Sequence, residues 1–293
     1  MTLLPRWFGI GAVVVTVGAI HSPAIRASTL EAFVPAYFYP SGAGLTYWNQ
    51  MTTAAATIPI TAILNPNSGP GAASDPNYAR AVDALRAAGG EVIGYVHTSY
   101  GTRSSAAVLA EVNNYASFYH LDGIFVDEMD NTLGSLNYYT GLYSSIKAAH
   151  PTWSVFGNPG TTTLEQYLTG PAADVLTVFE GDGANYPGYT PSSWNFNYDR
   201  SHFANLIYNV STAAVMQSDV TLVGARNAGH VYVTDDTLPN PYDTLPSYWD
   251  QEVSTIAELN AMPEPETLTL LTCALLSCEL WQLCRRLRSA SSS

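Results

Sequence analysis

Acidic side chains follow two apolar segments of this sequence, at the point where each segment ends. Asp127 and Glu128 come directly after Ile124-Phe125-Val126, and Glu180 comes directly after Val178-Phe179. Carboxylates at the ends of buried strands are costly unless they are paired or used in chemistry. Glycoside hydrolysis needs two carboxyl groups facing each other across a cleft, because one protonates the leaving oxygen and the other attacks the sugar or activates water. We therefore take Asp127, Glu128 and Glu180 as candidate catalytic residues; the sequence leaves the stereochemical outcome open.

These acids also allow other interpretations. Their carboxylates could cap the following loops or pair with Arg103 or Arg200. In a regular strand Asp127 and Glu128 would point to opposite sides, so that only one of them would face a cleft. A metal site made of these two acids and His97 is conceivable, but no ligand spacing supports it. We expect no metal ion and no other cofactor.

Polar and aromatic side chains end the other apolar segments as well. Planar rings can stack on the apolar faces of sugars, while hydroxyl and amide groups bind the sugar hydroxyls. We expect the following residues to bind substrate: Tyr37, Tyr39, Asn65, His97, Tyr100, Asn158, Tyr208 and Asp235. A structural role for His97 is an equal alternative. Further aromatic residues in or near the same predicted loops are Tyr47, Trp48, Tyr186, Trp194 and Tyr232.

Eight short segments, each almost continuously apolar, must position these residues. Such segments are typical of parallel strands that helices cover on both faces. The expected strands are Phe33–Pro40, Ile58–Asn65, Val92–Thr98, Gly123–Glu128, Trp153–Asn158, Val175–Glu180, Ala204–Tyr208 and His230–Thr234. Helical periodicity between them predicts helices at Asn77–Ala88, Ser105–Tyr119, Leu136–Ala149, Thr212–Asn227 and Tyr248–Asn260.

Eight strand–helix units in about 230 residues predict an α/β protein, a single-domain (β/α)8 TIM barrel. In that fold active residues lie at the carboxyl ends of the strands, where the acids are found. The alternative is a doubly wound open sheet. Its phosphate-binding fingerprint is absent after the first strand, because Ser41-Gly42-Ala43-Gly44 lacks the third glycine and a helix start.

The charge and the cysteine positions exclude some classes of binding partner and of metal site. The net charge is −13, and only 12% of the residues are charged. Nucleic acid is not an expected partner, because binding phosphates needs clustered Lys and Arg. A polar but weakly charged surface suits an extracellular protein that meets a neutral polysaccharide. The three cysteines all lie between Cys273 and Cys284, so the body holds no disulfide framework and no thiolate ligands.

The two ends are typical of sorting signals. Residues 1–27 are expected to be a secretory signal peptide, because Arg6 precedes an apolar run from Phe8 to Ile20. The alternative, a membrane anchor, would need a longer run. This end predicts export and contact with the export machinery.

The carboxyl-terminal part, residues 263–293, combines three elements in order. Pro263-Glu264-Pro265 is followed by an apolar stretch to Leu283 and then by Arg285, Arg286 and Arg288. This order resembles the bacterial PEP-CTERM sorting tail, which implies an exosortase-like partner and a bacterial cell-surface or extracellular location. The alternative is an amphipathic helix that packs on the body. We expect residues 28–262 to form the barrel and only the terminal segments to meet a membrane.

Several long motifs resemble the spherulin-4 family. They include Ala62-Ile63-Leu64-Asn65-Pro66-Asn67-Ser68-Gly69-Pro70-Gly71, Gly94-Tyr95-Val96-His97-Thr98-Ser99-Tyr100-Gly101-Thr102-Arg103 and Asp122-Gly123-Ile124-Phe125-Val126-Asp127-Glu128-Met129, within a match from Phe33 to Asn260. The resemblance implies a (β/α)8 glycoside hydrolase that cleaves α-1,4-linked polymer containing N-acetylgalactosamine or galactosamine from within. It implies Asp127 as nucleophile or charge stabiliser, Glu180 as general acid/base and Glu128 as a supporting carboxylate.

Two other functions remain open at this stage. A non-catalytic carbohydrate-binding or matrix protein on the same barrel would need the aromatic residues but not the acids, since fold alone does not fix function. A metal-dependent deacetylase would lose its activity on chelation.

Overall fold

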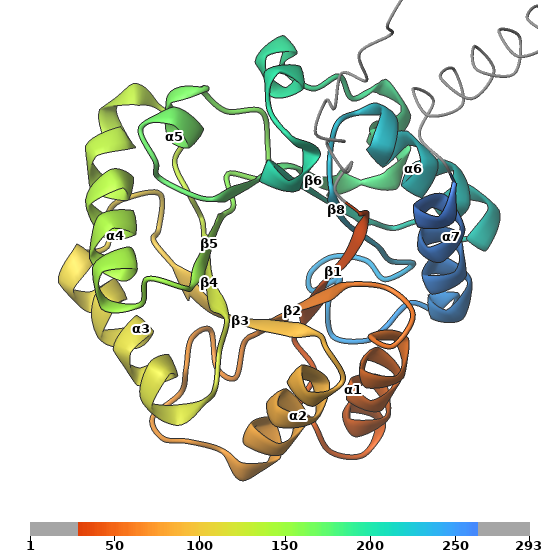
Figure 1. The fold of residues 1–293 in the computed structure, drawn as a ribbon, viewed down its shortest axis with the longest axis horizontal. Coiled ribbons are helices and arrows are strands. Elements are labelled where there is room, and N and C mark those ends of the chain that lie inside the picture. The colour runs from red at the N-terminus through yellow and green to blue at the C-terminus, as the bar shows by residue number, and fades with distance from the viewer. Residues whose placement is uncertain (1–28, 263–293) are drawn as a thin grey trace, which may run out of the picture.

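Eight parallel strands close into a barrel in which β1 is hydrogen-bonded to both β2 and β8 (Figure 1). The computed structural model describes residues 29–262, so the signal peptide and sorting tail expected at 1–27 and 263–293 lie outside the described residues. The strands are β1 Glu31–Ala36, β2 Ile60–Leu64, β3 Glu91–His97, β4 Gly123–Asp127, β5 Ser154–Gly157, β6 Val175–Asp182, β7 Phe203–Tyr208 and β8 His230–Val233. The predicted (β/α)8 barrel is confirmed, and every expected strand is present with its ends shifted by a few residues.

Helices surround the barrel as the helical patterns indicate. They are α1 Ala43–Ala54, α2 Pro76–Ala87, α3 Ser105–Phe118, α4 Leu136–Ala149, α5 Gln166–Thr169, α6 Ala213–Ala225 and α7 Trp249–Ala261. Side-chain caps begin three of them, because Asp75, Ser104 and Thr212 each accept a hydrogen bond from a backbone N–H of the first turn. All five expected helices are present, and α1 and α5 are additional to them.

The two units after β5 and β6 depart from regular strand–helix alternation. Only the single turn α5 follows β5. Three 3-10 turns, η2 Gly183–Gly188, η3 Ser193–Asn197 and η4 Arg200–His202, connect β6 to β7. Pro187 lies inside the first of these turns, where its ring and missing N–H are compatible with a short turn but not with a long helix.

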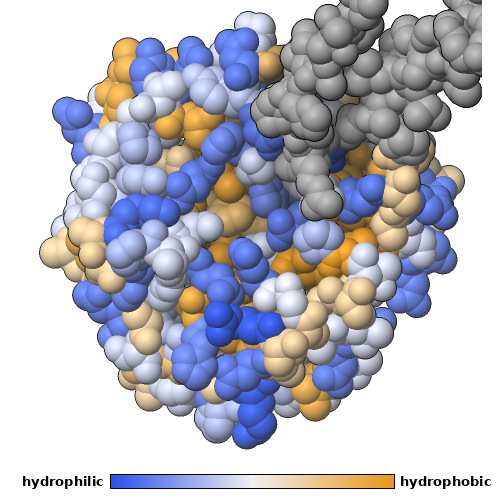
Figure 2. All heavy atoms as spheres, viewed as in Figure 1, coloured by the Kyte–Doolittle hydropathy of each residue, from blue (hydrophilic) through white to orange (hydrophobic). Residues whose placement is uncertain are grey.

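Side chains fill the interior of the barrel. The rings of Phe33 and Phe156 stack with their centroids 4.9 Å apart, and Phe125 tilts against Phe33 at 5.8 Å. All three are buried, and burying each such ring contributes about 1.5–3 kcal/mol. Hydrophilic residues cover most of the face seen in Figure 2, and hydrophobic residues show near its middle. The barrel is therefore a packed core that supports the polar residues at the strand ends.

One glycine next to the strand ends allows close packing. A Cβ at Gly157, the last residue of β5, would lie 2.6 Å from Cε of Met129. Met129 is buried directly after the acidic pair. The absence of a side chain at position 157 therefore lets the chain after β4 pack tightly on the end of β5.

The two ends of the barrel domain lie side by side. The backbone N–H of Leu30 donates to Oδ1 of Asn260 over 2.7 Å, and Nδ2 of Asn260 donates to the carbonyl of Leu30 over 2.8 Å. Leu30 precedes β1 and Asn260 lies in the last turn of α7, so both are at the amino end of the strands, opposite the acidic residues. Within residues 29–262, no helix is both long and apolar enough to cross a bilayer.

Candidate active site

A single amide joins the two acids that follow β4 and β6. Nδ2 of Asn158 donates to Oδ1 of Asp127 and to Oε2 of Glu180, each over 2.7 Å. Asp127 ends β4, Asn158 directly follows β5, and Glu180 lies near the end of β6. Three neighbouring strands thus bring these residues together at the carboxyl end of the barrel, as their positions in the sequence predict.

Each carboxylate also accepts a hydrogen bond from a tyrosine. The hydroxyl of Tyr95 donates to Oδ2 of Asp127 over 2.8 Å, and that of Tyr242 donates to Oε1 of Glu180 over 2.7 Å. The ring of Tyr37 stands nearly perpendicular to both tyrosine rings, with centroid distances of 5.7 Å to Tyr95 and 5.6 Å to Tyr242. The carboxylates are therefore held at both oxygens, over a packed aromatic support.

Burial makes ionisation of both acids less favourable. It raises the pKa of Asp127, although hydrogen bonds from Tyr95, the Glu128 backbone and Asn158 oppose the rise. Burial also raises the pKa of Glu180, and the neighbouring charge of Asp127 raises it further. Asp127 has one more donor than Glu180, because it also accepts from the Glu128 backbone N–H. The two acids lie within one hydrogen-bonded group, so the pKa of each carboxyl depends on the charge of the other.

The chain turns sharply directly after Asp127. Glu128 has a φ of 52°, in the left-handed region that non-glycine residues rarely adopt. Its carbonyl accepts hydrogen bonds from Oγ1 of Thr98, over 2.7 Å, and from the backbone N–H of Tyr100, over 2.8 Å. Strict strand alternation therefore does not apply to Asp127 and Glu128. A strained conformation held by several bonds is typical of functional sites.

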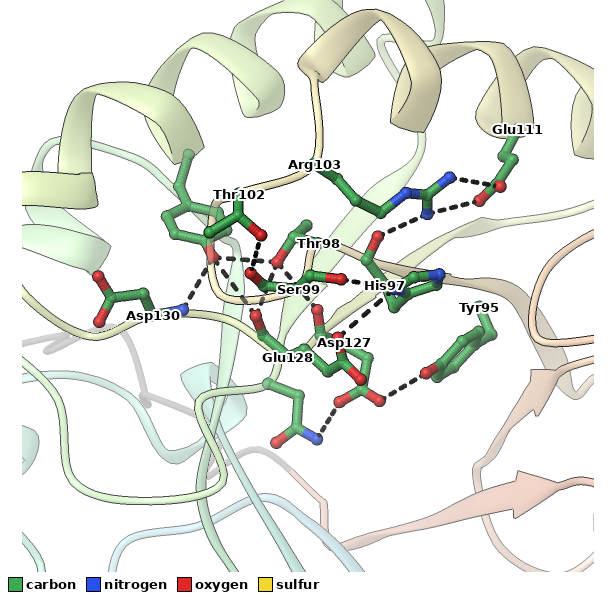
Figure 3. Close-up of polar contacts among 12 residues, drawn as sticks. Tyr95, His97, Thr98, Ser99, Thr102, Arg103, Glu111, Asp127, Glu128 and Asp130 are labelled. Carbon is green, nitrogen blue, oxygen red and sulfur yellow. Dashed lines mark hydrogen bonds and ion pairs between the residues drawn. The ribbon is translucent and has the colours of Figure 1, made fainter.

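This turn directs the Glu128 carboxylate to His97, as Figure 3 shows. Oε2 of Glu128 lies 3.4 Å from Nδ1 of His97, which is also 3.3 Å from Oγ of Ser99. The side chains of Glu128 and His97 are 38% and 31% exposed, so this second acidic group faces solvent at the mouth of the barrel. His97 ends β3, so the two residues lie on adjacent strand ends.

Arg103 does not pair with the acids at the strand ends. It binds Glu111, with Nη2 2.6 Å from Oε1, and Nη1 donates to the carbonyl of His97 over 2.8 Å. Figure 3 shows this pair on the side of His97 away from Asp127. Among residues 29–262, no three His, Cys, Asp or Glu side chains are arranged so that they could hold a metal ion.

Six other residues are predicted to bind substrate. Three of them lie near the acid pair or beside the turn at Glu128, and three bind rim loops. Tyr37 and Tyr208 lie near the acid pair, since the charge of Glu180 contributes to the raised pKa of both phenols after burial, the largest cause. Tyr100 is 66% exposed in the loop after β3.

The remaining three bind rim loops: Tyr39 binds the loop after β2, whereas Asn65 and Asp235 bind the loops to which they belong. The hydroxyl of Tyr39 donates to Asp75 over 3.0 Å, Asn65 accepts from the backbone N–H of Gly69 over 3.0 Å, and Asp235 accepts from the backbone N–H of Ser247. Their contacts within the described residues are with these loops and not with the acid pair.

Three aromatic residues expected near the rim lie in the core. Trp48, Tyr186 and Tyr232 are fully buried, so these three rings pack inside the protein and are not exposed for stacking on a sugar. Trp48 belongs to the helix α1, which was not expected, and Tyr232 lies within β8. The apolar residues Trp48 and Met51 are three positions apart, and this helical spacing in the sequence indicates that their side chains lie on the buried face of a helix.

Two tyrosines of the site, Tyr95 and Tyr242, are not among the residues predicted from the sequence. Tyr95 lies two residues before His97 on β3, and strand alternation places residues with this spacing on the same face. The two-residue spacing from His97 is therefore a signal in the sequence that indicates Tyr95 as a site residue. Tyr242 lies in the loop between β8 and α7, where no periodicity relates it to Glu180.

Comparison with known proteins gives one family and several similar structures. Residues 31–256 match the model of spherulation-specific family 4. Spherulin-4 of Physarum polycephalum is 34% identical over 252 residues, which cover 82% of this chain and 74% of that protein. The crystal structure of Aspergillus clavatus Sph3 in complex with GalNAc has a TM-score of 0.69 at 24% identity and covers 79% of this chain and 99% of its own. A cyclic maltosyl-maltose hydrolase from Arthrobacter globiformis shares the fold, with a TM-score of 0.53 at 9% identity and coverage of 82% and 83%.

Proposed function

Since the chain belongs to spherulation-specific family 4, we propose that it is an exported glycoside hydrolase that cleaves α-1,4-linked polysaccharide containing N-acetylgalactosamine or galactosamine from within. The observation that carries this proposal is the amide-linked pair of carboxylates, Asp127 and Glu180, at the carboxyl end of the barrel. TIM-barrel enzymes place their active sites at this end. The GalNAc in the similar Sph3 structure supports the substrate class.

The spacing of the acids favours retention of the anomeric configuration. One nitrogen lies 2.7 Å from Oδ1 of Asp127 and 2.7 Å from Oε2 of Glu180, so these oxygens are separated by no more than twice that distance. Retaining glycosidases hold their carboxyl groups about 5–5.5 Å apart, whereas inverting ones need about 6.5–9.5 Å to admit a water molecule. We therefore assign a double displacement.

The hydrogen bonds around each acid suggest its role. Asp127, with the greater number of donors, is the carboxylate that attacks the anomeric carbon, and Glu180 is the acid that gives its proton to the leaving oxygen. In the second half, Glu180 takes a proton from water as the water oxygen attacks the same carbon. The bond to Asp127 then breaks, and both acids return to their starting states.

Glu128 and His97 lie beside this pair at the mouth of the barrel. We assign Glu128 as a supporting carboxylate, because its backbone N–H stabilises ionised Asp127 while its side chain faces His97. Tyr37, Tyr39, Asn65, His97, Tyr100, Asn158, Tyr208 and Asp235 are the residues proposed from the sequence to bind the sugar. The site so proposed spans several strand ends, as a polymer substrate requires.

The net charge supports the proposed substrate, and the two terminal segments support the proposed location of the protein. A net charge of −13 would attract a partly deacetylated, cationic polymer. The segments 1–27 and 263–293 carry the signal-peptide and PEP-CTERM patterns on which export and bacterial surface location are proposed. The corresponding partners are the export machinery and an exosortase-like enzyme.

The direct test is product release from purified polymer of N-acetylgalactosamine and galactosamine. Residues 28–262 are compared with Asp127→Asn and Glu180→Gln, each shown to be folded by circular dichroism. Short oligosaccharides released by the wild type alone would support an endo-acting hydrolase that uses both acids. Polymer binding without release by a folded wild type would instead favour a carbohydrate-binding protein.

A further inference from the structure

Both donor hydrogens of the Asn158 amide are committed to the two acids. Nδ2 lies 2.7 Å from an oxygen of Asp127 and 2.7 Å from an oxygen of Glu180. The other amide atom, Oδ1, is buried and accepts no hydrogen bond from the residues that the structure describes. The whole residue is only 6% exposed. A substrate oxygen could accept a hydrogen bond from this amide only by displacing one of the carboxylates.

The backbone around Asn158 is fixed on both sides. Its N–H donates to the carbonyl of Val126 over 2.9 Å, and its carbonyl accepts from the N–H of Met129 over 3.0 Å. Two residues later, the carbonyl of Gly160 accepts from the N–H of Glu180 over 2.9 Å. Asn158 is thus tied to the segment that carries Asp127, and its loop is tied to the residue that carries the second carboxylate.

We propose that Asn158 is a positioning residue, whose amide sets the separation of Asp127 and Glu180 and keeps them within the range of a double displacement. This deepens the proposed function and depends on it for its catalytic consequence. It differs from the substrate-binding role predicted from the sequence. Because both N–H groups of the amide bind the acids, its effect on the reaction is exerted through them.

The electrostatic reason is the proximity of two like charges. Two carboxylates this close repel each other when both are ionised, and a shared N–H donor partly offsets that repulsion. Hydrogen bonds from Asn158 oppose the rise in the pKa of both acids. The other titratable groups around the pair are Tyr37, Tyr95, Glu128, Tyr208 and Tyr242. The tyrosines are neutral at pH 7, Glu128 adds negative charge, and His97 lies 3.4 Å from Glu128. Loss of the amide therefore leaves the acid pair with Tyr95 and Tyr242 as its side-chain donors.

Removing the amide should alter the pKa of Glu180 and the rate of the reaction more than it alters the affinity for substrate. In Asn158→Ala, we expect the pKa of Glu180 to rise by about one pH unit, because a donor to its charged form is gone. We expect kcat to fall about 10- to 100-fold, since misplacement by about 1 Å costs this much, while KM stays within about threefold. The basic limb of the kcat profile should move to higher pH.

The experiment uses the full chain with ¹³C-labelled Glu carboxyl groups, and NMR follows their titration without substrate. The Glu180 resonance is identified by its absence in Glu180→Gln. Asn205→Ala is the matched control. Asn205 is likewise a buried amide whose Oδ1 has no hydrogen-bond partner among residues 29–262, but it lies within β7 and donates to Tyr186 and not to an acid. It should leave the Glu180 titration and the pH profile of kcat unchanged.

The outcomes separate the two proposals. An unchanged pKa of Glu180 in Asn158→Ala would overturn the positioning role, as would a higher KM at unchanged kcat, which marks a substrate-binding residue. If the wild type releases no product from any glycan, the proposed function fails, while the titration still decides whether the amide sets the pair. If Asn158→Ala does not fold, the isosteric Asn158→Asp replaces the donor by an acceptor and should raise the pKa of Glu180 even more.

Discussion

The hydroxyl of Tyr242 donates a 2.7 Å hydrogen bond to Oε1 of Glu180, although 62 positions of sequence separate the two residues. Tyr242 lies in the loop between β8 and α7, and Glu180 lies in β6. The loop between β8 and α7 thus contacts an acid on β6, a strand that is not its neighbour in the barrel.

Tyr242→Phe should move the basic limb of the kcat profile to higher pH. The change removes a donor that favours the charged form of Glu180, so the carboxyl keeps its proton longer. It should also cost about 0.5–1.5 kcal/mol of stability, the usual contribution of one hydrogen bond. Kinetics between pH 4 and 9 and denaturant unfolding measure the two effects. A basic limb that does not move would argue against Glu180 as the acid.

Tyr95→Phe should move the opposite limb. Tyr95 donates to Asp127 over 2.8 Å, and loss of this bond raises the pKa of Asp127, the proposed nucleophile, which would have to be ionised to attack. The acidic limb should therefore shift to higher pH while the basic limb stays. The same pH series tests this, with Tyr242→Phe as the matched variant. If both variants moved the same limb, the roles of Asp127 and Glu180 assigned here would be wrong.

Glu128→Gly should lower activity at least about 100-fold without loss of stability. The substitution removes a proposed supporting carboxylate and relieves a left-handed backbone that costs an ordinary residue about 1–2 kcal/mol. The midpoint of thermal unfolding should stay the same or rise. Ser68→Gly is the control, because Ser68 has a φ of 47° in the loop after β2. It should change stability in the same direction and leave turnover as in the wild type.

Glu252 predicts how stability changes with pH. This residue of α7 is fully buried, Oε1 accepts from the backbone N–H of Val233 over 2.9 Å, and burial raises the pKa of Glu252 from 4.5 to about 8. The folded state therefore binds a proton that the unfolded state releases. This contribution to stability is complete below pH 4.5, declines as pH rises from 4.5 to about 8, and is lost above that range.

Glu252→Gln keeps the acceptor and cannot ionise. Its unfolding free energy should fall less than that of the wild type between pH 5 and 8.5, as measured by urea titration at several pH values. Glu258→Gln, an exposed site on the same helix, makes the same charge change without burial and should follow the wild-type curve. Equal slopes for all three proteins would show that Glu252 ionises normally in the folded state.

The strands and the acids could be predicted because each depends on local sequence. Continuous apolar runs mark buried parallel strands, and Asp127 and Glu180 appear where two such runs end. The orientation of Glu128 could not be predicted, because it depends on a left-handed turn that hydrogen bonds from Thr98 and Tyr100, in the loop after β3, hold in place. The presence of Asn158 at the site was predicted, but its contact with both acids depends on the register of three strands.

The paired hydrogen bonds between Leu30 and Asn260 bring the entry and exit of the chain to one point on the barrel. That point lies at the end opposite Asp127 and Glu180. A tether attached through either end would therefore hold the barrel by the amino ends of its strands, with the carboxyl ends of the strands facing away from the point of attachment. An enzyme held in this way on a surface would present its acids to polymer in the surrounding medium and not to the layer to which it is fixed.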